Sequence, residues 1–137
     1  MKKIAYLLCA LFAFVAVRAQ DPVKWTASVE KKSDTEYTLI FKAAIEEHWH
    51  MYSQYTADGG SLPLELVFNN DKGNFEAAGK AAESPTKKQF NDIFGVEETF
   101  WENTAELRQE IKVINQANSI VQAELTYQVC KESCIQG

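Results

Sequence analysis

The sequence has 137 residues, of which 46% are hydrophobic, and a formal net charge of −5. This length suits one domain behind a short leader, since domains usually run from about 50 to 200 residues. The negative charge argues against nucleic-acid binding, because proteins neutralise phosphates with Lys and Arg.

The N-terminus has the pattern of a cleavable secretory signal. Two lysines precede an unbroken apolar run from Ile4 to Val17, and Ala19 stands at the position that a signal peptidase reads. The run is shorter than the roughly 20 apolar residues of a membrane span. We therefore expect a signal peptide over residues 1–19 and an exported, soluble domain over residues 20–137.

Strict alternation of apolar and polar residues predicts half-buried strands along most of the domain. In chain order, the alternating runs are Val23 to Val29, Tyr37 to Ile45, Leu62 to Phe68 and Val121 to Val129. Turn residues separate them, including Asp58-Gly59-Gly60 and the polar run 69–73. Two further strands, Val96–Trp101 and 105–114, are expected to form a hairpin through Glu102-Asn103.

The segment from Glu83 to Gly95 does not have the pattern of a strand. It contains Pro85 and many polar residues, followed by Phe90, Ile93 and Phe94. Two interpretations stay open: a surface loop whose aromatic side chains pack into the core, or a loop that covers something. About seven short strands with regular turns predict an all-β fold, an immunoglobulin-like β-sandwich.

Two cysteines remain once Cys9 leaves with the leader, and they lie close together near the C-terminus. Cys130 falls on the polar face of the last predicted strand, outside the core set, and Cys134 follows in a polar loop. A disulfide between them closes a very short loop, so it adds little to fold stability. Exposed bridges of this kind tend to be labile or catalytic. An inert structural bridge is the alternative.

The two histidines suggest a metal site as a second alternative. His48 and His50 would share one face of a strand with Tyr52, and with the two cysteines they make a donor set suited to Zn or Cu. The spacing does not match the usual zinc signatures, so we expect no metal.

The segments HWHMYSQY, DGGSLPLELVF, NDIFGVEETFWE and YQVCKESC, in this order, resemble the N-terminal periplasmic domain of the DsbD thiol:disulfide interchange family. The resemblance covers nearly the whole exported chain, and its most specific part is the YQVC…C ending. It implies an immunoglobulin-like domain with a redox-active cysteine pair, working as a protein-disulfide reductase without a cofactor. Such domains take electrons from a thioredoxin-like donor and pass them to periplasmic oxidoreductases, including those of cytochrome c maturation.

The resemblance also assigns roles to individual residues. It implies that Cys130 and Cys134 are the redox pair, and that Cys134 bonds to partners while Cys130 resolves the mixed disulfide. The strand-end position of Cys130 and the polar approach to Cys134 favour the same order of attack. The cap loop that folds over the disulfide corresponds to Asp92, Ile93, Phe94 and Gly95, and the aromatic positions that flank the cysteines correspond to His50 and Tyr52.

Three departures from the family pattern carry expectations of their own. The better-known family members have more residues between the cysteines. The transmembrane and thioredoxin-like domains do not occur in this sequence, so electrons come from a separate chain, to whose membrane-bound form the exported domain could be tethered, or the sequence is a fragment. The family continues into a further strand after the second cysteine, whereas this sequence ends at Gly137. We therefore expect a missing return strand and an open sheet edge.

Overall fold

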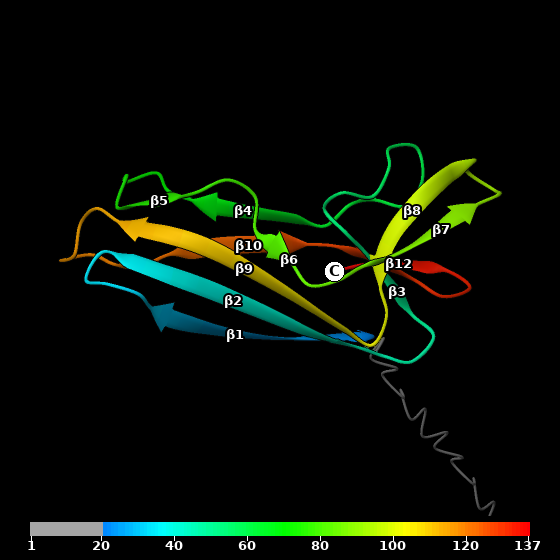
Figure 1. Ribbon diagram of the computed structural model, residues 1–137, viewed down its shortest axis with the longest axis horizontal. Coiled ribbons are helices and arrows are strands. Elements are labelled where there is room, and N and C mark those ends of the chain that lie inside the picture. The colour runs from blue at the N-terminus through cyan, green and yellow to red at the C-terminus, as the bar shows by residue number, and fades with distance from the viewer. Residues whose placement is uncertain (1–20) are drawn as a thin grey trace, which may run out of the picture.

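The computed structural model describes residues 21–137, and every helix or strand in that range is a β-strand in an antiparallel pair (Figure 1). The all-β prediction is confirmed. The expected signal peptide over residues 1–19 lies outside the described residues. Within them, no helix has the length and apolar character needed to cross a membrane.

The largest sheet forms one layer of a sandwich. Its members are β1 (Val23–Lys31), β2 (Glu36–Ile45), β9 (Thr104–Val113) and β5 (Phe75–Ala77), in this spatial order, with β6 (Ala82–Glu83) also paired to β9. The hairpin of β1 and β2 follows the two alternating runs that the sequence shows.

The second layer consists of two ladders. One pairs β10 (Gln122–Thr126) with β4 (Glu65–Asn69), and the other has the order β12 (Cys134–Gln136), β11 (Gln128–Cys130), β3 (His50–Tyr52), β8 (Val96–Trp101) and β7 (Lys87–Asn91). The break at Tyr127 separates β10 from β11, which the sequence pattern presents as one strand. In Figure 1 the ladder with β3, β7, β8 and β12 occupies one end of the elongated body. The architecture is the predicted immunoglobulin-like sandwich.

One core cluster joins the two layers. Trp101, Met51, Leu107 and Val129 are almost completely buried in it. Trp101 Nε1 donates a hydrogen bond of 3.1 Å to the carbonyl of Ser84, so burial of its one polar atom leaves no unpaired donor. Met51, Trp101 and Val129 come from neighbouring strands of the β3–β8–β11 ladder, so this ladder turns one face to the core. Its other face stays available for a site.

The expected hairpin of the strands 96–101 and 105–114 is wrong, although both strands exist. β8 pairs with β3 and β7, whereas β9 pairs with β2, β5 and β6. The Glu102-Asn103 turn is a corner at which the chain passes from one sheet to the other, with Asn103 in the left-handed region at φ 65°. A period of two predicts which side chains share a face but not which strands are neighbours.

The segment 83–95 also differs from its description as a loop. Lys87–Asn91 forms β7, an edge strand with mostly exposed side chains on both faces, so it has no alternation to detect. Phe90 is 59% exposed, which rules out the interpretation in which the aromatic side chains of this segment pack into the core. The residues 92–95 form the turn between β7 and β8.

Not all of the predicted core face of β1 is buried. Val23 is buried, but Val29 is 61% exposed and lies with Ala27 along an open groove of about 480 Å³ between β1, β2 and the segment before β10. This groove lies toward the end of the body away from β12 (Figure 1).

Candidate functional site

The two cysteines lie directly opposite each other in the hairpin of β11 and β12. They form a disulfide with a Cα–Cα distance of 4.1 Å. Lys131 N donates to Ser133 O across the turn (3.0 Å), and Tyr127 and Gly137 exchange two backbone hydrogen bonds of 3.0 Å beyond the cysteines. The expectation of a missing return strand is therefore wrong, because β12 is that strand. Cys134 begins a strand and does not lie in a loop.

The two sulfur-bearing residues differ sharply in exposure. Cys130 lies on the face opposite the core residue Val129, as the alternation predicts, but it is 9% exposed and packs with Tyr52 and Phe100. Cys130 is outside the main core cluster, as expected, but it is not solvated, since this face has a small apolar cluster of its own. Cys134 is exposed. A partner from solution therefore meets Cys134 first.

His50 occupies the position next to Cys130 on the neighbouring strand. The register of β3 and β11 pairs the two residues, so Cys134, Cys130 and His50 form one row across three strands. The imidazole stacks on the ring of Phe100, with centroids 4.0 Å apart and planes 11° apart. Its Nε2 lies 2.8 Å from Glu102 Oε1.

Glu102 links the histidine to a lysine of β7. Lys87 pairs with its second carboxylate oxygen. The hydrogen bond from Lys87 is the largest cause that holds the pKa of Glu102 below its usual value, and His50 acts in the same direction. The carboxylate is therefore ionised at neutral pH and fixes one nitrogen of the imidazole.

Tyr52 and Glu98 lie further along the same face. Tyr52 is 4% exposed, and burial raises the pKa of its phenol, with Glu98 adding to the rise while Ser61 opposes it. Glu98 is 6% exposed and accepts hydrogen bonds from Ser61 N (2.9 Å), Ser61 Oγ (2.7 Å) and Asn91 Nδ2 (3.1 Å). Burial alone would raise the pKa of Glu98, but these hydrogen bonds outweigh it and the pKa is lowered.

Gly60 explains the DGG segment. A Cβ atom at this position would lie 2.8 Å from Val96 Cγ2 and 2.9 Å from Glu98 Oε1. The loop therefore approaches β8 closely enough for Ser61 to reach the buried carboxylate, and a larger residue would displace it.

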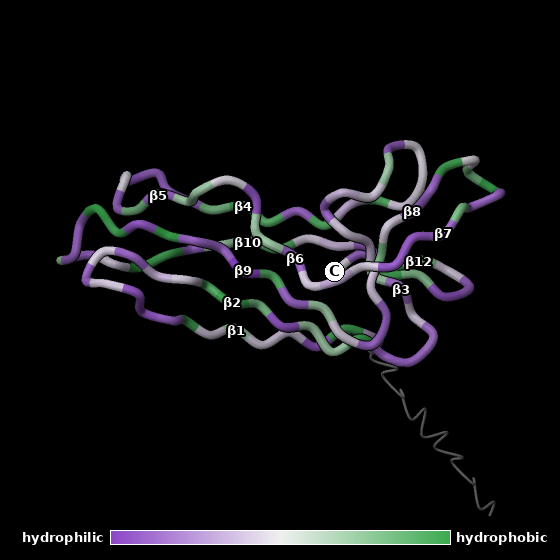
Figure 2. The backbone as a smooth tube through the Cα atoms, in the orientation of Figure 1, coloured by the Kyte–Doolittle hydropathy of each residue, from purple (hydrophilic) through white to green (hydrophobic). Residues whose placement is uncertain are grey.

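The residues Asp92, Ile93, Phe94 and Gly95 form the tip of the β7–β8 hairpin. Asn91 Oδ1 accepts hydrogen bonds from the backbone N of Ile93 (2.9 Å) and Phe94 (3.3 Å), and Gly95 adopts φ 70°. Ile93 is 89% and Phe94 51% exposed, and Figure 2 shows a hydrophobic stretch next to a hydrophilic one at this end of the β7–β8 hairpin. The conformation described here leaves Cys134 exposed as well, so a cap role for the tip stays a prediction.

The structure does not bring the residues of the metal alternative together. His48 lies in a turn at φ 70°, not in a strand with His50, and its side chain is 72% exposed. Both cysteines are in the disulfide. Over residues 21–137 no three His, Cys, Asp or Glu side chains are grouped so as to hold a metal ion.

Sequence reasoning missed several members of this face. Glu98, Phe100 and Glu102 stand at every second position, and the core residue Trp101 stands between the last two of them. That alternation was the available signal, since it places these side chains on the face that carries Cys130. Nothing in the sequence indicated that Asn91 and Ser61 would meet at Glu98.

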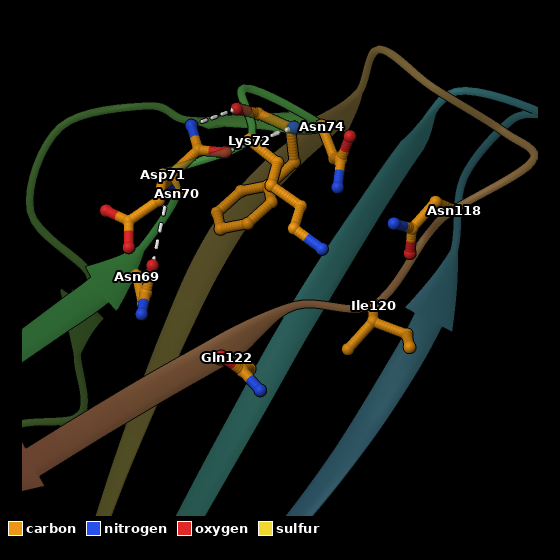
Figure 3. A pocket seen from close by; sticks show the side chains of 9 residues that line it. Asn69, Asn70, Asp71, Lys72, Asn74, Asn118, Ile120 and Gln122 are labelled. Atoms are coloured by element: carbon orange, nitrogen blue, oxygen red, sulfur yellow. Dashed lines mark hydrogen bonds between the residues drawn. The ribbon is translucent and has the colours of Figure 1, made fainter.

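Two hollows on the surface of the described residues lie away from the cysteines. A polar cleft of about 210 Å³ is lined by the loops 69–74 and 118–122 (Figure 3). There Asn70 Nδ2 donates to Phe75 O, and Asn69 Oδ1 accepts from Asp71 N (3.2 Å), so these amides tie the loop together. Neither this cleft nor the groove beside Val29 is lined by a cysteine or a histidine.

The solved structures similar to this chain include two N-terminal domains. The N-terminal periplasmic domain of ScsB from Proteus mirabilis matches with a TM-score of 0.57 and 15% identity, over 86% of this chain and 44% of that one. The N-terminal domain of Neisseria meningitidis DsbD in the reduced form matches with a TM-score of 0.47 and 16% identity, over 82% of this chain and 79% of that one. The chain thus spans less than half of the ScsB domain. The first likeness supports the fold alone.

No curated protein matches the sequence. The model of one family does, described as thiol:disulfide interchange protein DsbD, N-terminal, and it matches residues 17–137. That range includes both cysteines, His50, Tyr52 and the β7–β8 hairpin. The chain therefore belongs to the family of DsbD N-terminal domains.

Proposed function

We propose that this domain relays reducing equivalents in the periplasm, from a thioredoxin-like or transmembrane donor to periplasmic oxidoreductases, through Cys130 and Cys134. The observation that carries the proposal is an exposed Cys134 bridged to a buried Cys130. A disulfide with one accessible sulfur directs an attacking thiolate to that sulfur. The family match and the likeness to the periplasmic domain of ScsB support the compartment.

The exchange balances without a cofactor. A donor thiolate attacks Cys134 Sγ, the Cys134–Cys130 bond breaks, and its electron pair leaves on Cys130 Sγ. The thiolate of the donor's second cysteine then attacks the donor sulfur that is bonded to Cys134. This forms the donor's disulfide and releases Cys134 as a thiolate. The donor is oxidised and the domain holds two thiols. The same steps in reverse pass two electrons to an oxidised acceptor.

Trapping tests which sulfur meets the partner. The probe is a thioredoxin-like protein whose single cysteine carries 2-nitro-5-thiobenzoate as a leaving group. Cys130→Ser leaves the exposed Cys134 thiol, and we expect it to release the chromophore and accumulate a covalent complex. Cys134→Ser leaves the buried thiol, and we expect at least about tenfold slower complex formation, or about 1.4 kcal/mol in activation free energy. The reverse order would overturn the assignment.

A structural bridge in a non-catalytic binding domain is the alternative function. Equilibration of the native protein with glutathione separates the two, because structural disulfides have reduction potentials below about −300 mV. A reduction potential below about −300 mV, together with no covalent complex from either cysteine variant, would contradict the relay.

A further inference from the structure

The reduced state places an ionisable sulfur in an apolar setting. When Cys134 bonds to a partner, the electron pair of the broken disulfide stays on Cys130, which is 9% exposed among Tyr52 and Phe100. Burial of an unpaired charge is costly, so this environment favours the neutral thiol of Cys130 over its thiolate. A proton donor close to this sulfur would remove that cost in one step.

His50 is the group placed to supply the proton. It is the cross-strand partner of Cys130, and side chains directly opposite each other have Cβ atoms about 4.5–5.5 Å apart. Both side chains contact Phe100, Cys130 in the apolar cluster and His50 by stacking, so they share one face of the ladder. Imidazole is the side chain whose ordinary titration range lies nearest neutral pH.

The other charged and titratable groups around His50 do not fit this task. Glu98 on β8 is negative and would repel a thiolate. Tyr52 on β3 is buried, and its raised pKa keeps it neutral. Lys87 on β7 is engaged with Glu102. Lys131 neighbours Cys130 in the chain but is exposed in the turn.

Glu102 positions the imidazole for the transfer. Nε2 lies 2.8 Å from Glu102 Oε1, so the Nε2–H group donates a hydrogen bond to the carboxylate. Nδ1 is then the nitrogen left to exchange a proton with the sulfur. The Lys87 pair holds the carboxylate in place and ionised. A carboxylate behind a histidine fixes its tautomer and orientation and stabilises its protonated form.

We propose that His50 is the acid and base for Cys130 during exchange and that Glu102 is its positioning residue. In the reductive direction, imidazolium Nδ1 gives its proton to the departing Cys130 sulfur, which leaves a neutral thiol and a neutral imidazole. In the opposite direction, imidazole takes the thiol proton and the thiolate attacks Cys134 Sγ. That attack forms the disulfide and releases the partner thiolate. The inference rests on the proposed exchange at this cysteine pair.

The test measures the rate of disulfide reduction by dithiothreitol against pH, with the rate divided by the concentration of dithiothreitol thiolate. In the wild type this normalised rate should rise as pH falls through the titration of His50, which NMR of the same protein locates. His50→Phe keeps an aromatic ring on Phe100 but has no proton to give. We expect it to lose the rise and to react at least about tenfold more slowly at pH 6, at the low end for acid–base catalysis.

Two further variants separate chemistry from structure. Glu102→Gln should keep the pH-dependent rise but lower the rate reached at low pH, since the carboxylate no longer holds the imidazole in place. His48→Gln, at an exposed histidine two positions away, should behave as the wild type. A second readout is the pKa of the Cys130 thiol in Cys134→Ser, which His50→Phe should raise by about one unit, or tenfold in the ionisation equilibrium.

The outcomes are distinct. A His50→Phe profile and thiol pKa that match the wild type would overturn the role of His50 and leave the relay standing, because trapping at Cys134 in Cys130→Ser does not involve the Cys130 thiolate. Failure of the wild type to exchange with any thiol would overturn both. If His50→Phe does not fold, His50→Gln carries the same expectation.

Discussion

Glu98 gives the sharpest test of how the face that carries Cys130 is held together. Its Oε1 accepts two hydrogen bonds from Ser61, and its Oε2 accepts one from Asn91 Nδ2. Glu98→Gln keeps the shape but turns one acceptor oxygen into an NH₂ donor. With the Gln oxygen toward Ser61, the new NH₂ faces the NH₂ of Asn91. Asn91 cannot turn its amide over without losing the bonds from Ile93 N and Phe94 N.

The expected loss in the free energy of unfolding follows from the hydrogen bonds that Glu98→Gln breaks. One hydrogen bond to an ionised group is worth about 1.5–3 kcal/mol, and a buried donor left without an acceptor costs about 1–3 kcal/mol. Partial relaxation of the hairpin reduces the sum, so we expect the free energy of unfolding to fall by about 2–4 kcal/mol at pH 7. That is a large part of the roughly 5–15 kcal/mol that stabilise a domain.

The loss should depend on pH in one direction. The pKa of Glu98 is lowered in the folded state, because the bonds from Ser61 and Asn91 outweigh the effect of burial. A lowered pKa stabilises the fold fully above the unfolded value of about 4.3, and this stabilisation disappears as pH falls through the folded value. The difference between wild type and Glu98→Gln should therefore shrink from pH 6 toward pH 3.

Urea denaturation of the full chain, followed by tryptophan fluorescence at several pH values, measures both effects. Glu97→Gln is the matched control, because its carboxylate is 59% exposed and lies 3.5 Å from Lys88 Nζ. Exposed pairs of this kind contribute about 0–1 kcal/mol. If Glu98→Gln costs no more than the control, or if its cost is the same at every pH, then Glu98 does not hold this face together.

Two more predictions concern other parts of the chain. Alanine at both Ile93 and Phe94 should speed reduction by dithiothreitol and lower the free energy of unfolding by less than about 1 kcal/mol, since both side chains are mainly exposed; a loss of several kcal/mol with unchanged reactivity would assign them to the core. Burial and then the 2.7 Å bond to Asp21 raise the pKa of Tyr127 to about 12. Wild-type stability should therefore fall between pH 10 and 12. In an ultraviolet titration, Asp21→Asn should lower this pKa, and an unchanged value would remove Asp21 as a cause.

Much of the fold could be predicted because alternation reports burial of one strand face. The runs that became β1, β2, β8 and β9 were all visible. Their partners were not, since pairing depends on contacts distant in the sequence. β7 was missed because an edge strand exposed on both faces has no alternation, and Pro85 beside it suggested a loop.

The site was predicted in its chemistry and less well in its surroundings. The cysteines and His50 stood out as residue types, and the resemblance placed them together. The burial of Cys130 was not visible, because the face opposite the core is usually solvated. Here Phe100 and Tyr52 cover it, and their contribution depends on the register of β3 against β8.

The hairpin of β11 and β12 has a consequence for how long partners stay attached. Its register is held by backbone hydrogen bonds on both sides of the disulfide, at Lys131–Ser133 and at Tyr127–Gly137. These bonds do not need the sulfur–sulfur bond, so reduction leaves the two thiols facing each other. Cys130 is then present at a very high effective concentration against any partner disulfide at Cys134, and the intramolecular step outpaces attack by a free thiol. Under the proposed relay, covalent complexes at Cys134 should therefore be short-lived.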